Sequence, residues 1–213
     1  MKILFKSIIF ILLISIMLIT ITGCSQTATN TETEQPDKIT LDDSPEVLDM
    51  SLELPSNFKN IDAASEGMSN KDMGLGSDWS EVELFLSENP FQMIFAYMSI
   101  IESQVERATA DALLKNEEQI KTLVIESLKA GAAEEGIEFA EISVDITYPD
   151  LGDMAILGSG AMSIIGIDFG YEILMFRVNK VYVTVCSLCL SSEKQSLITV
   201  AEGIVQRIGL YSQ

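Results

Sequence analysis

The stretch FRVNKVYVTVCSLC (Phe176–Cys189) contains two runs of strand-forming residues separated by a short polar break. Val178-Asn179-Lys180-Val181 has the spacing of a tight hairpin, and asparagine tolerates the positive φ that such a turn requires. A hairpin places its two strands antiparallel. We therefore expect an antiparallel sheet in the C-terminal half of the chain.

Further strands are expected on the N-terminal side of this hairpin. Alternating apolar and polar residues indicate half-buried strands, and glycine-dotted apolar segments are compatible with them. A closing amphipathic helix follows the hairpin, with a cap predicted at Ser192 and Gln195. The expected strands are residues 50–54 (ended by Pro55), 81–86, 142–148, 154–165 and 167–178.

Two helices are expected between the early and the late strands. Asn89-Pro90 is suited to open the first, because asparagine caps helices and proline fits the first turn. Apolar residues then recur at helical spacing from Phe91 to Val105, and the segment is apolar nearly all round. This pattern predicts a helix buried between layers, and a helix that binds in the groove of a partner is the alternative. Asn116 with Gln119 predicts a capping box for the second helix, and Gly131 or Gly136 would end it.

The order of strands, helices, strands and helix favours an α+β fold with a mostly antiparallel sheet covered by helices. Three stretches carry a resemblance: LELPSNF (Leu52–Phe58), FRVNKVYVTV (Phe176–Val185) and LITVAEGIVQRI (Leu197–Ile208). Together they resemble the Mog1/PsbP-like group of domains, from Leu48 to the C-terminus. The resemblance implies an α/β sandwich and a small bacterial lipoprotein or accessory protein, mostly without enzymatic activity.

The N-terminus has the organisation of a secretory signal. Lys2 and Lys6 precede an unbroken apolar run, and a small residue, Gly23, precedes Cys24. The four residues Ile21–Cys24 resemble the bacterial lipobox, in which the cysteine is lipidated and becomes the new N-terminus. A membrane-spanning helix is the alternative, because the apolar length approaches what a bilayer needs. We expect residues 1–23 to be a lipoprotein signal peptide.

Residues 24–44 are expected to form the lipidated cysteine and a flexible tether. The segment Ser25–Asp43 is rich in Ser, Thr, Glu and Asp, so it cannot bury enough apolar surface to offset its ordering entropy. Residues 45–213 then have the size of a single α+β domain. The expected location is the cell membrane, with the domain lipid-anchored through Cys24 and facing outward, in the periplasm or on the cell surface.

The chain is strongly acidic. It has 13 Lys and Arg against 32 Asp and Glu, and the two signal lysines are absent from the exported part, whose formal charge is therefore −21. This charge argues against binding to nucleic acid or to anionic lipid. The chain has no histidine, which removes the usual metal ligand and proton shuttle. The acidity either aids solubility or attracts a cationic partner.

A long loop is expected at Ser65–Ser80, and Asn70, Asp72, Asp78 and Trp79 in it are candidates for ligand or partner contacts. An EF-hand register starting at Asn70 would place Gly74 and Leu75 where a ligand oxygen and a glycine are required. The loop therefore does not predict a calcium site, and no metal site is expected.

Cys186 and Cys189 form a C-x-x-C pair, for which three interpretations are open. In a regular strand, residues three apart point to opposite faces and lie too far apart for a disulfide, which favours two buried strand residues. A disulfide would require a turn at Ser187-Leu188, and a thiol redox or Cu(I) site is the third interpretation.

Catalytic motifs are weak. A Ser-His-Asp triad is impossible without histidine, and the Ser-x-x-Lys pairs at Ser56–Lys59 and Ser191–Lys194 lack the companion motif of penicillin-binding proteins. No catalytic residue or cofactor is predicted. We expect a non-enzymatic binding or accessory module for an unknown protein or small molecule. The alternatives are a thiol redox or copper-handling protein and, third, a weak envelope hydrolase.

Overall fold

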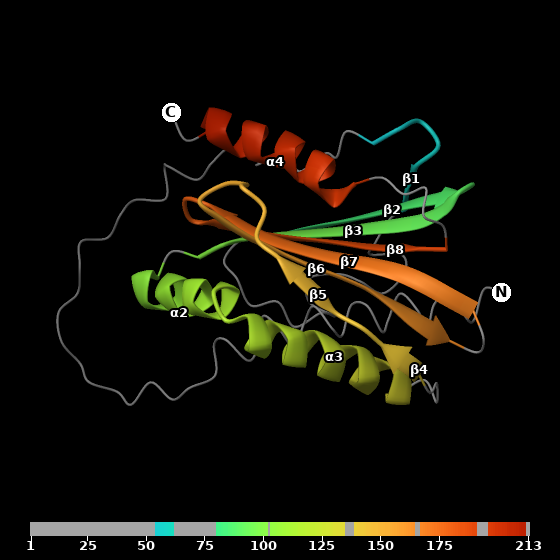
Figure 1. The fold of residues 1–213 in the computed structure, drawn as a ribbon. Helices are drawn as coiled ribbons and strands as arrows, with labels where there is room; N and C mark the ends of the chain where they lie inside the picture. Colours follow the sequence, from blue (N-terminus) through green and yellow to red (C-terminus); the bar gives the residue numbers. More distant parts are fainter. Residues whose placement is uncertain are drawn as a thin grey trace.

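The computed structural model describes residues 54–61, 80–101, 103–134, 139–164, 167–190 and 196–211. Over these ranges, eight strands form one sheet; α4 covers one face, and α2 and α3 cover the other (Figure 1). The elements are β1 (Lys59–Ile61), β2 (Ser80–Glu88), β3 (Phe91–Ile100), α2 (Gln104–Leu114), α3 (Glu117–Glu134), β4 (Phe139–Ile142), β5 (Asp145–Thr147), β6 (Met154–Ile164), β7 (Ile167–Val178), β8 (Val181–Cys189) and α4 (Leu197–Tyr211).

The strand order is β1-β2-β3-β8-β7-β6-β4, and β5 also pairs with β6. Each of these pairings is antiparallel. The last strand, β8, lies between β3 and β7, so the early and late parts of the chain meet in the middle of the sheet. The prediction of an α+β fold with a mostly antiparallel sheet covered by helices is confirmed.

The hairpin predicted at Val178–Val181 joins β7 to β8. Val178 and Val181 are register partners, and Asn179 has φ of 55°, which is the left-handed conformation expected for this turn. The hairpin fixes the register of β7 against β8, from Val178↔Val181 to Gly170↔Cys189. The predicted strands that precede it are present as β6 and β7.

The predicted helix that begins at Asn89-Pro90 is wrong. Asn89 and Pro90, joined by a cis peptide bond, form the turn between β2 and β3, and Phe91–Ile100 is the strand β3. β3 lies between β2 and β8, and both of its faces are covered, so every residue from Gln92 to Ser99 is buried. A strand buried on both faces has no polar alternation, and its apolar run therefore also fits helical spacing.

Helix formation begins later than predicted. α2 starts after Ser103, whose Oγ accepts a hydrogen bond from the backbone N–H of Glu106 at 3.3 Å. The capping box of the next helix is confirmed, because the Gln119 backbone N–H donates to Asn116 Oδ1 at 3.1 Å and the two side chains also hydrogen-bond. α3 continues through Gly131 to Glu134.

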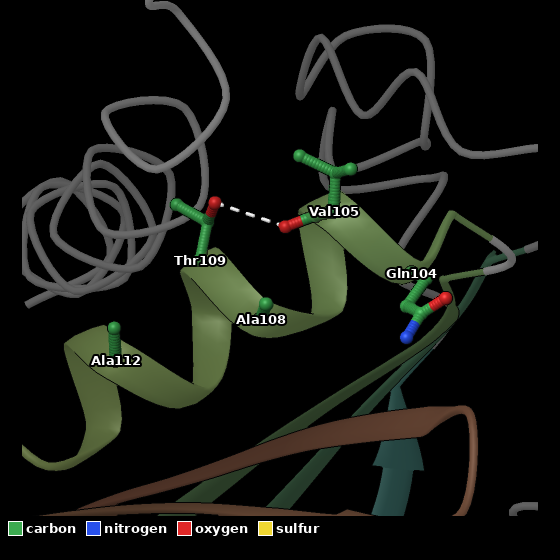
Figure 2. Close-up of a pocket in the computed structure, with 5 residues that line it drawn as sticks. All are labelled: Gln104, Val105, Ala108, Thr109 and Ala112. Carbon is green, nitrogen blue, oxygen red and sulfur yellow. Dashed lines mark hydrogen bonds between the residues drawn. The ribbon is translucent and has the colours of Figure 1, made fainter.

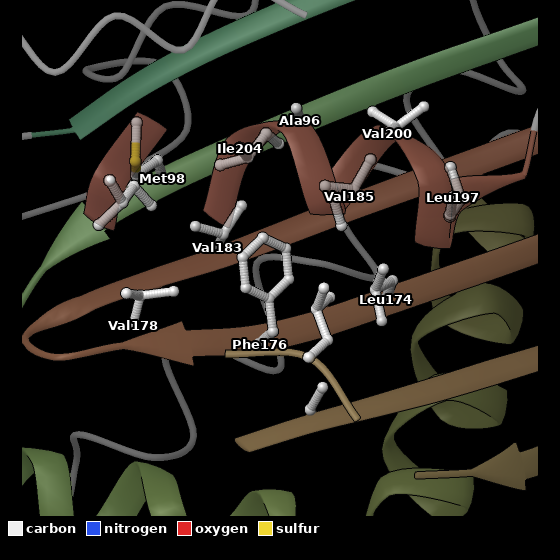
Figure 3. Close-up of a cluster of buried hydrophobic side chains, with 14 of the residues drawn as sticks. Ala96, Met98, Leu174, Phe176, Val178, Val183, Val185, Leu197, Val200 and Ile204 are labelled. Carbon is white, nitrogen blue, oxygen red and sulfur yellow. The ribbon is translucent and has the colours of Figure 1, made fainter. Parts of the chain in front are cut away.

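The sheet has a separate apolar core on each face. α3 contributes Ile120, Val124 and Leu128, which are fully buried against the side chains on one face. α4 covers the other face, and Figure 3 shows Leu197, Val200 and Ile204 above side chains of β7 and β8. Burying each such side chain stabilises the fold by about 1.5–3 kcal/mol. The predicted amphipathic closing helix is present as α4, and its predicted cap lies outside the described residues.

Two early and middle strands differ from prediction. The strand expected at residues 50–54 lies almost entirely outside the described residues, and Leu54 is not in a strand; the short β1 was not predicted. The alternating segment from Ile142 to Tyr148 is divided into β4 and β5, and Tyr148 is 52% exposed. The division occurs at Ser143, whose carbonyl oxygen accepts a hydrogen bond from Tyr171 Oη at 2.6 Å.

Two glycine substitutions should change stability in opposite directions. A Cβ at Gly160 would lie 1.8 Å from the carbonyl oxygen of Ser143, so Gly160→Ala requires the backbone to move and should lower the free energy of unfolding by about 1–3 kcal/mol. Gly203 lies inside α4, and a Cβ there meets nothing within 4 Å. Gly203→Ala should therefore raise stability by up to about 1 kcal/mol. Urea unfolding of both variants measures the two effects, and equal effects would contradict this account.

Candidate functional site

Several residues predicted as site residues lie outside the part of the chain that the structure describes. These are the lipidation site Cys24, the loop candidates Asn70, Asp72, Asp78 and Trp79, and the second Ser-x-x-Lys pair at Ser191 and Lys194. Of the first pair, Ser56 and Lys59 are described, and both are exposed.

The two thiols lie in β8, where both are buried and neither forms a disulfide. They are three residues apart in a continuous strand, so their side chains point to opposite faces. Cys186 packs in the core that faces α2 and α3, whereas Cys189 Sγ lies 3.5 Å from the carbonyl oxygen of Gly170. Burial raises the pKa of the Cys186 thiol far above its ordinary value. Because the thiolate is the nucleophile and the metal ligand, this environment holds Cys186 in its unreactive form.

A partly buried polar cluster lies where the β7–β8 hairpin meets α2. We call it the Arg177 cluster; it consists of Asp111, Asp153, Arg177, Asn179 and Tyr182. Arg177 and Tyr182 are register partners on β7 and β8, so the hairpin places their side chains next to each other on the α2 side of the sheet.

The turn before β6 immobilises Arg177 from one side. Arg177 Nη1 lies 3.0 Å from Asp153 Oδ2 and 2.8 Å from the carbonyl oxygen of Asn179. The backbone N–H of Asn179 donates to the same carboxylate oxygen at 2.7 Å. Gly152 enables this approach: its φ is 61°, and a Cβ there would lie 2.5 Å from the carbonyl oxygen of Arg177.

From the other side, α2 supplies Asp111. Arg177 Nε lies 2.9 Å from Asp111 Oδ1, and Tyr182 Oη donates to the same carboxylate oxygen at 2.9 Å. Tyr182 Oη also lies 3.1 Å from the carbonyl oxygen of Arg107, one turn earlier in α2. Burial, followed by the hydrogen bond to Asp111, raises the pKa of Tyr182 above its ordinary value of 10.0. The phenol therefore stays protonated and can act as a donor.

The Arg177 cluster has a structural role, because its contacts hold segments of the fold in position. Its guanidinium already contacts two carboxylates and a carbonyl, and each of these contacts joins a different segment of the fold. Across the described ranges, no three or more Cys, Asp or Glu side chains are placed to hold a metal ion. The cluster fixes α2 against the hairpin. Sequence reasoning missed it because Asp111 and Arg177 are 66 residues apart.

The outer face of α2 has a shallow, open hollow. Figure 2 shows its lining residues along one side of the helix: Gln104, Val105, Ala108, Thr109 and Ala112. Val105 is 76% exposed, and Thr109 Oγ1 donates to the carbonyl oxygen of Val105 at 3.0 Å rather than pointing a free hydroxyl outward. These side chains carry no charge, so the hollow offers surface contact and no acid or base for proton transfer.

Comparison of the chain with protein-family models, with curated proteins and with solved structures finds no match. None of the helices within the described ranges is long and apolar enough to cross a membrane.

The two thiols should be inert in the folded protein. With a thiol reagent such as DTNB, we expect almost no labelling of Cys186 and Cys189 in native conditions and two labelled thiols after denaturation. A Cu(I) titration of the native protein should show no site that depends on either cysteine. Rapid native labelling of both thiols would support the redox interpretation instead.

Stability should fall in alkaline solution. The Cys186 thiol has an ordinary pKa of 9.0, which applies to the unfolded chain, and burial raises its pKa in the folded protein. Above pH 9 the thiol ionises in the unfolded chain first, so the stabilisation is complete below pH 9, and above it the free energy of unfolding falls with a slope on the order of 1 kcal/mol per pH unit. Cys186→Ala should reduce this slope. Val185→Ala, a change at the adjacent buried residue, should lower stability without changing the slope.

Proposed function

We propose that this protein is a lipid-anchored, outward-facing protein of the cell envelope, whose α+β domain is a non-enzymatic binding or accessory module. The observation that carries the anchor is the N-terminal sequence: Lys2 and Lys6, an unbroken apolar run, and Ile21–Cys24 with the lipobox pattern. The acidic stretch that follows suits a tether, because it has few large apolar side chains.

Three ionisable groups of the domain have structural surroundings or partners, which supports a non-enzymatic role. Cys186 is packed in a core, Tyr171 donates to the backbone of Ser143, and Tyr182 donates to Asp111. A catalytic acid, base or nucleophile must reach a substrate. These three groups, whose pKa values are all raised, instead hold secondary-structure elements together.

The layered architecture supports membership of the Mog1/PsbP-like group as the finer description of the fold. That resemblance implies an α/β sandwich, and in this chain helices lie on both faces of an antiparallel sheet. The acidic character of the chain favours a neutral or cationic partner, either a protein or a small molecule, over nucleic acid.

Replacing the proposed lipidation site tests the anchor directly. Cys24→Ala should move the protein from the detergent phase to the aqueous phase in Triton X-114 partition, because the acyl chains provide its membrane affinity. Cys189→Ala, which removes a buried thiol of the domain, is the matched control and should stay in the detergent phase. Incorporation of labelled palmitate into the Cys24→Ala protein would contradict the proposal.

A further inference from the structure

α2 is attached to the sheet in a different way from the other two helices. Leu114, its last residue, is its only buried side chain, although α2 is eleven residues long. α3 buries Ile120, Val124 and Leu128, and α4 has an apolar stripe along its length. Apart from Leu114 and the partly buried Leu113 at its C-terminal end, α2 has neutral and apolar residues on its outer face, whereas the charged Asp111 faces the sheet.

Polar contacts replace the missing apolar ones. Asp111 Oδ1 accepts hydrogen bonds from Arg177 Nε and Tyr182 Oη, both at 2.9 Å. Tyr182 Oη also lies within hydrogen-bond distance of the carbonyl oxygen of Arg107. Asp111 is therefore the side chain through which α2 is bonded to β7 and β8. Arg177 Nη1 donates to both Asp153 Oδ2 and the carbonyl oxygen of Asn179, so the guanidinium would stay in place if α2 moved away.

Each end of α2 is joined to its neighbour by one short connection. Arg107 Nη1 donates to the carbonyl oxygen of Ile101 at 2.8 Å, and the backbone N–H of Asn116 donates to the carbonyl oxygen of Leu113 at 2.9 Å. At the N-terminal end, Ser103 caps the helix, and Ile101 before it is bonded through its N–H to the carbonyl oxygen of Lys180 at 3.0 Å. At the C-terminal end, Lys115 ends α2, and α3 begins with its own capping box at Asn116. Because the bonds donated by Arg107 and Asn116 lie at the ends of α2, a rotation of the helix about them leaves the hydrogen bonds within α3 and the pairing of β3 intact.

We propose that α2 is a hinged cover that opens from the sheet as a unit, with the bonds of Asp111 to Arg177 and Tyr182 as its latch. α2 contacts Arg177 and Tyr182 in the sheet row Met154–Arg177–Tyr182, and the next row on the same face contains Ile156 and Met175. The cover thus controls access to an apolar surface with one cation at its edge. This inference concerns the motion of a described helix and stands whether or not the proposed membrane anchor exists.

Hydrogen–deuterium exchange of the full chain in detergent micelles tests the cover. The amides of α2 should exchange at least about tenfold faster than those of Ile120–Leu128 in α3, and their exchange should be insensitive to low urea, because local opening exposes little surface. Exchange of α2 at the same rate as α3, and with the same urea dependence, would show that the helix opens only when the domain unfolds, and would overturn the proposal.

Two variants test the latch. Asp111→Asn removes the ion pair with Arg177 while it leaves an oxygen for Tyr182, and it should speed the exchange of α2 about tenfold with little change in α3 and α4. Glu117→Gln removes the ion pair between Glu117 and Lys121 on α3, and it should leave the exchange of α2 unchanged. Equal acceleration of all three helices by Asp111→Asn would mean that Asp111 supports the domain generally, and would overturn its role as a latch.

Discussion

Burial of both faces of the central strands is the constraint on which the rest of the structure depends. Gln92–Ser99 of β3 and Val183–Cys189 of β8 are buried throughout, because helices cover the sheet on both sides. Polar side chains in this region must find partners inside the protein, as Gln92 does by donating to Ser187 Oγ at 2.9 Å. Chemistry with a ligand is therefore restricted to the periphery, where the Arg177 cluster and α2 lie.

The parts of the fold that the sequence predicts correctly depend on residues close together in the chain. Asn179 specifies its turn through its own φ, and Asn116 caps a helix through a bond to a residue three positions later. The closing helix is recognisable because only one of its sides is buried, so its apolar stripe has a clear period. Such signals do not require knowledge of the tertiary structure.

The wrong and missing predictions depend on distant parts of the chain. Whether Phe91–Ile100 forms a helix or a strand is decided by β2 and β8 on either side of it, since its apolar run fits both periods. α2 gives no sequence signal for its orientation, because the charge that faces inward is satisfied by Arg177, 66 residues away. The proposed ligand loop and the lipidation site fall outside the described residues, so they remain sequence predictions.

α3 and α2 lie on the same face of the sheet, but the free-energy cost of separating each helix from it differs. Separating α3 would expose Ile120, Val124 and Leu128, at a cost of about 1.5–3 kcal/mol for each side chain. Separating α2 would expose Leu114 and the partly buried Leu113, and it would return Asp111 to water, where its hydration replaces much of the lost ion-pair energy. A polar latch is therefore less costly to open than an apolar one. It still fixes the closed position of α2, because Asp111 Oδ1 must lie within hydrogen-bond distance of Arg177 Nε and Tyr182 Oη at the same time.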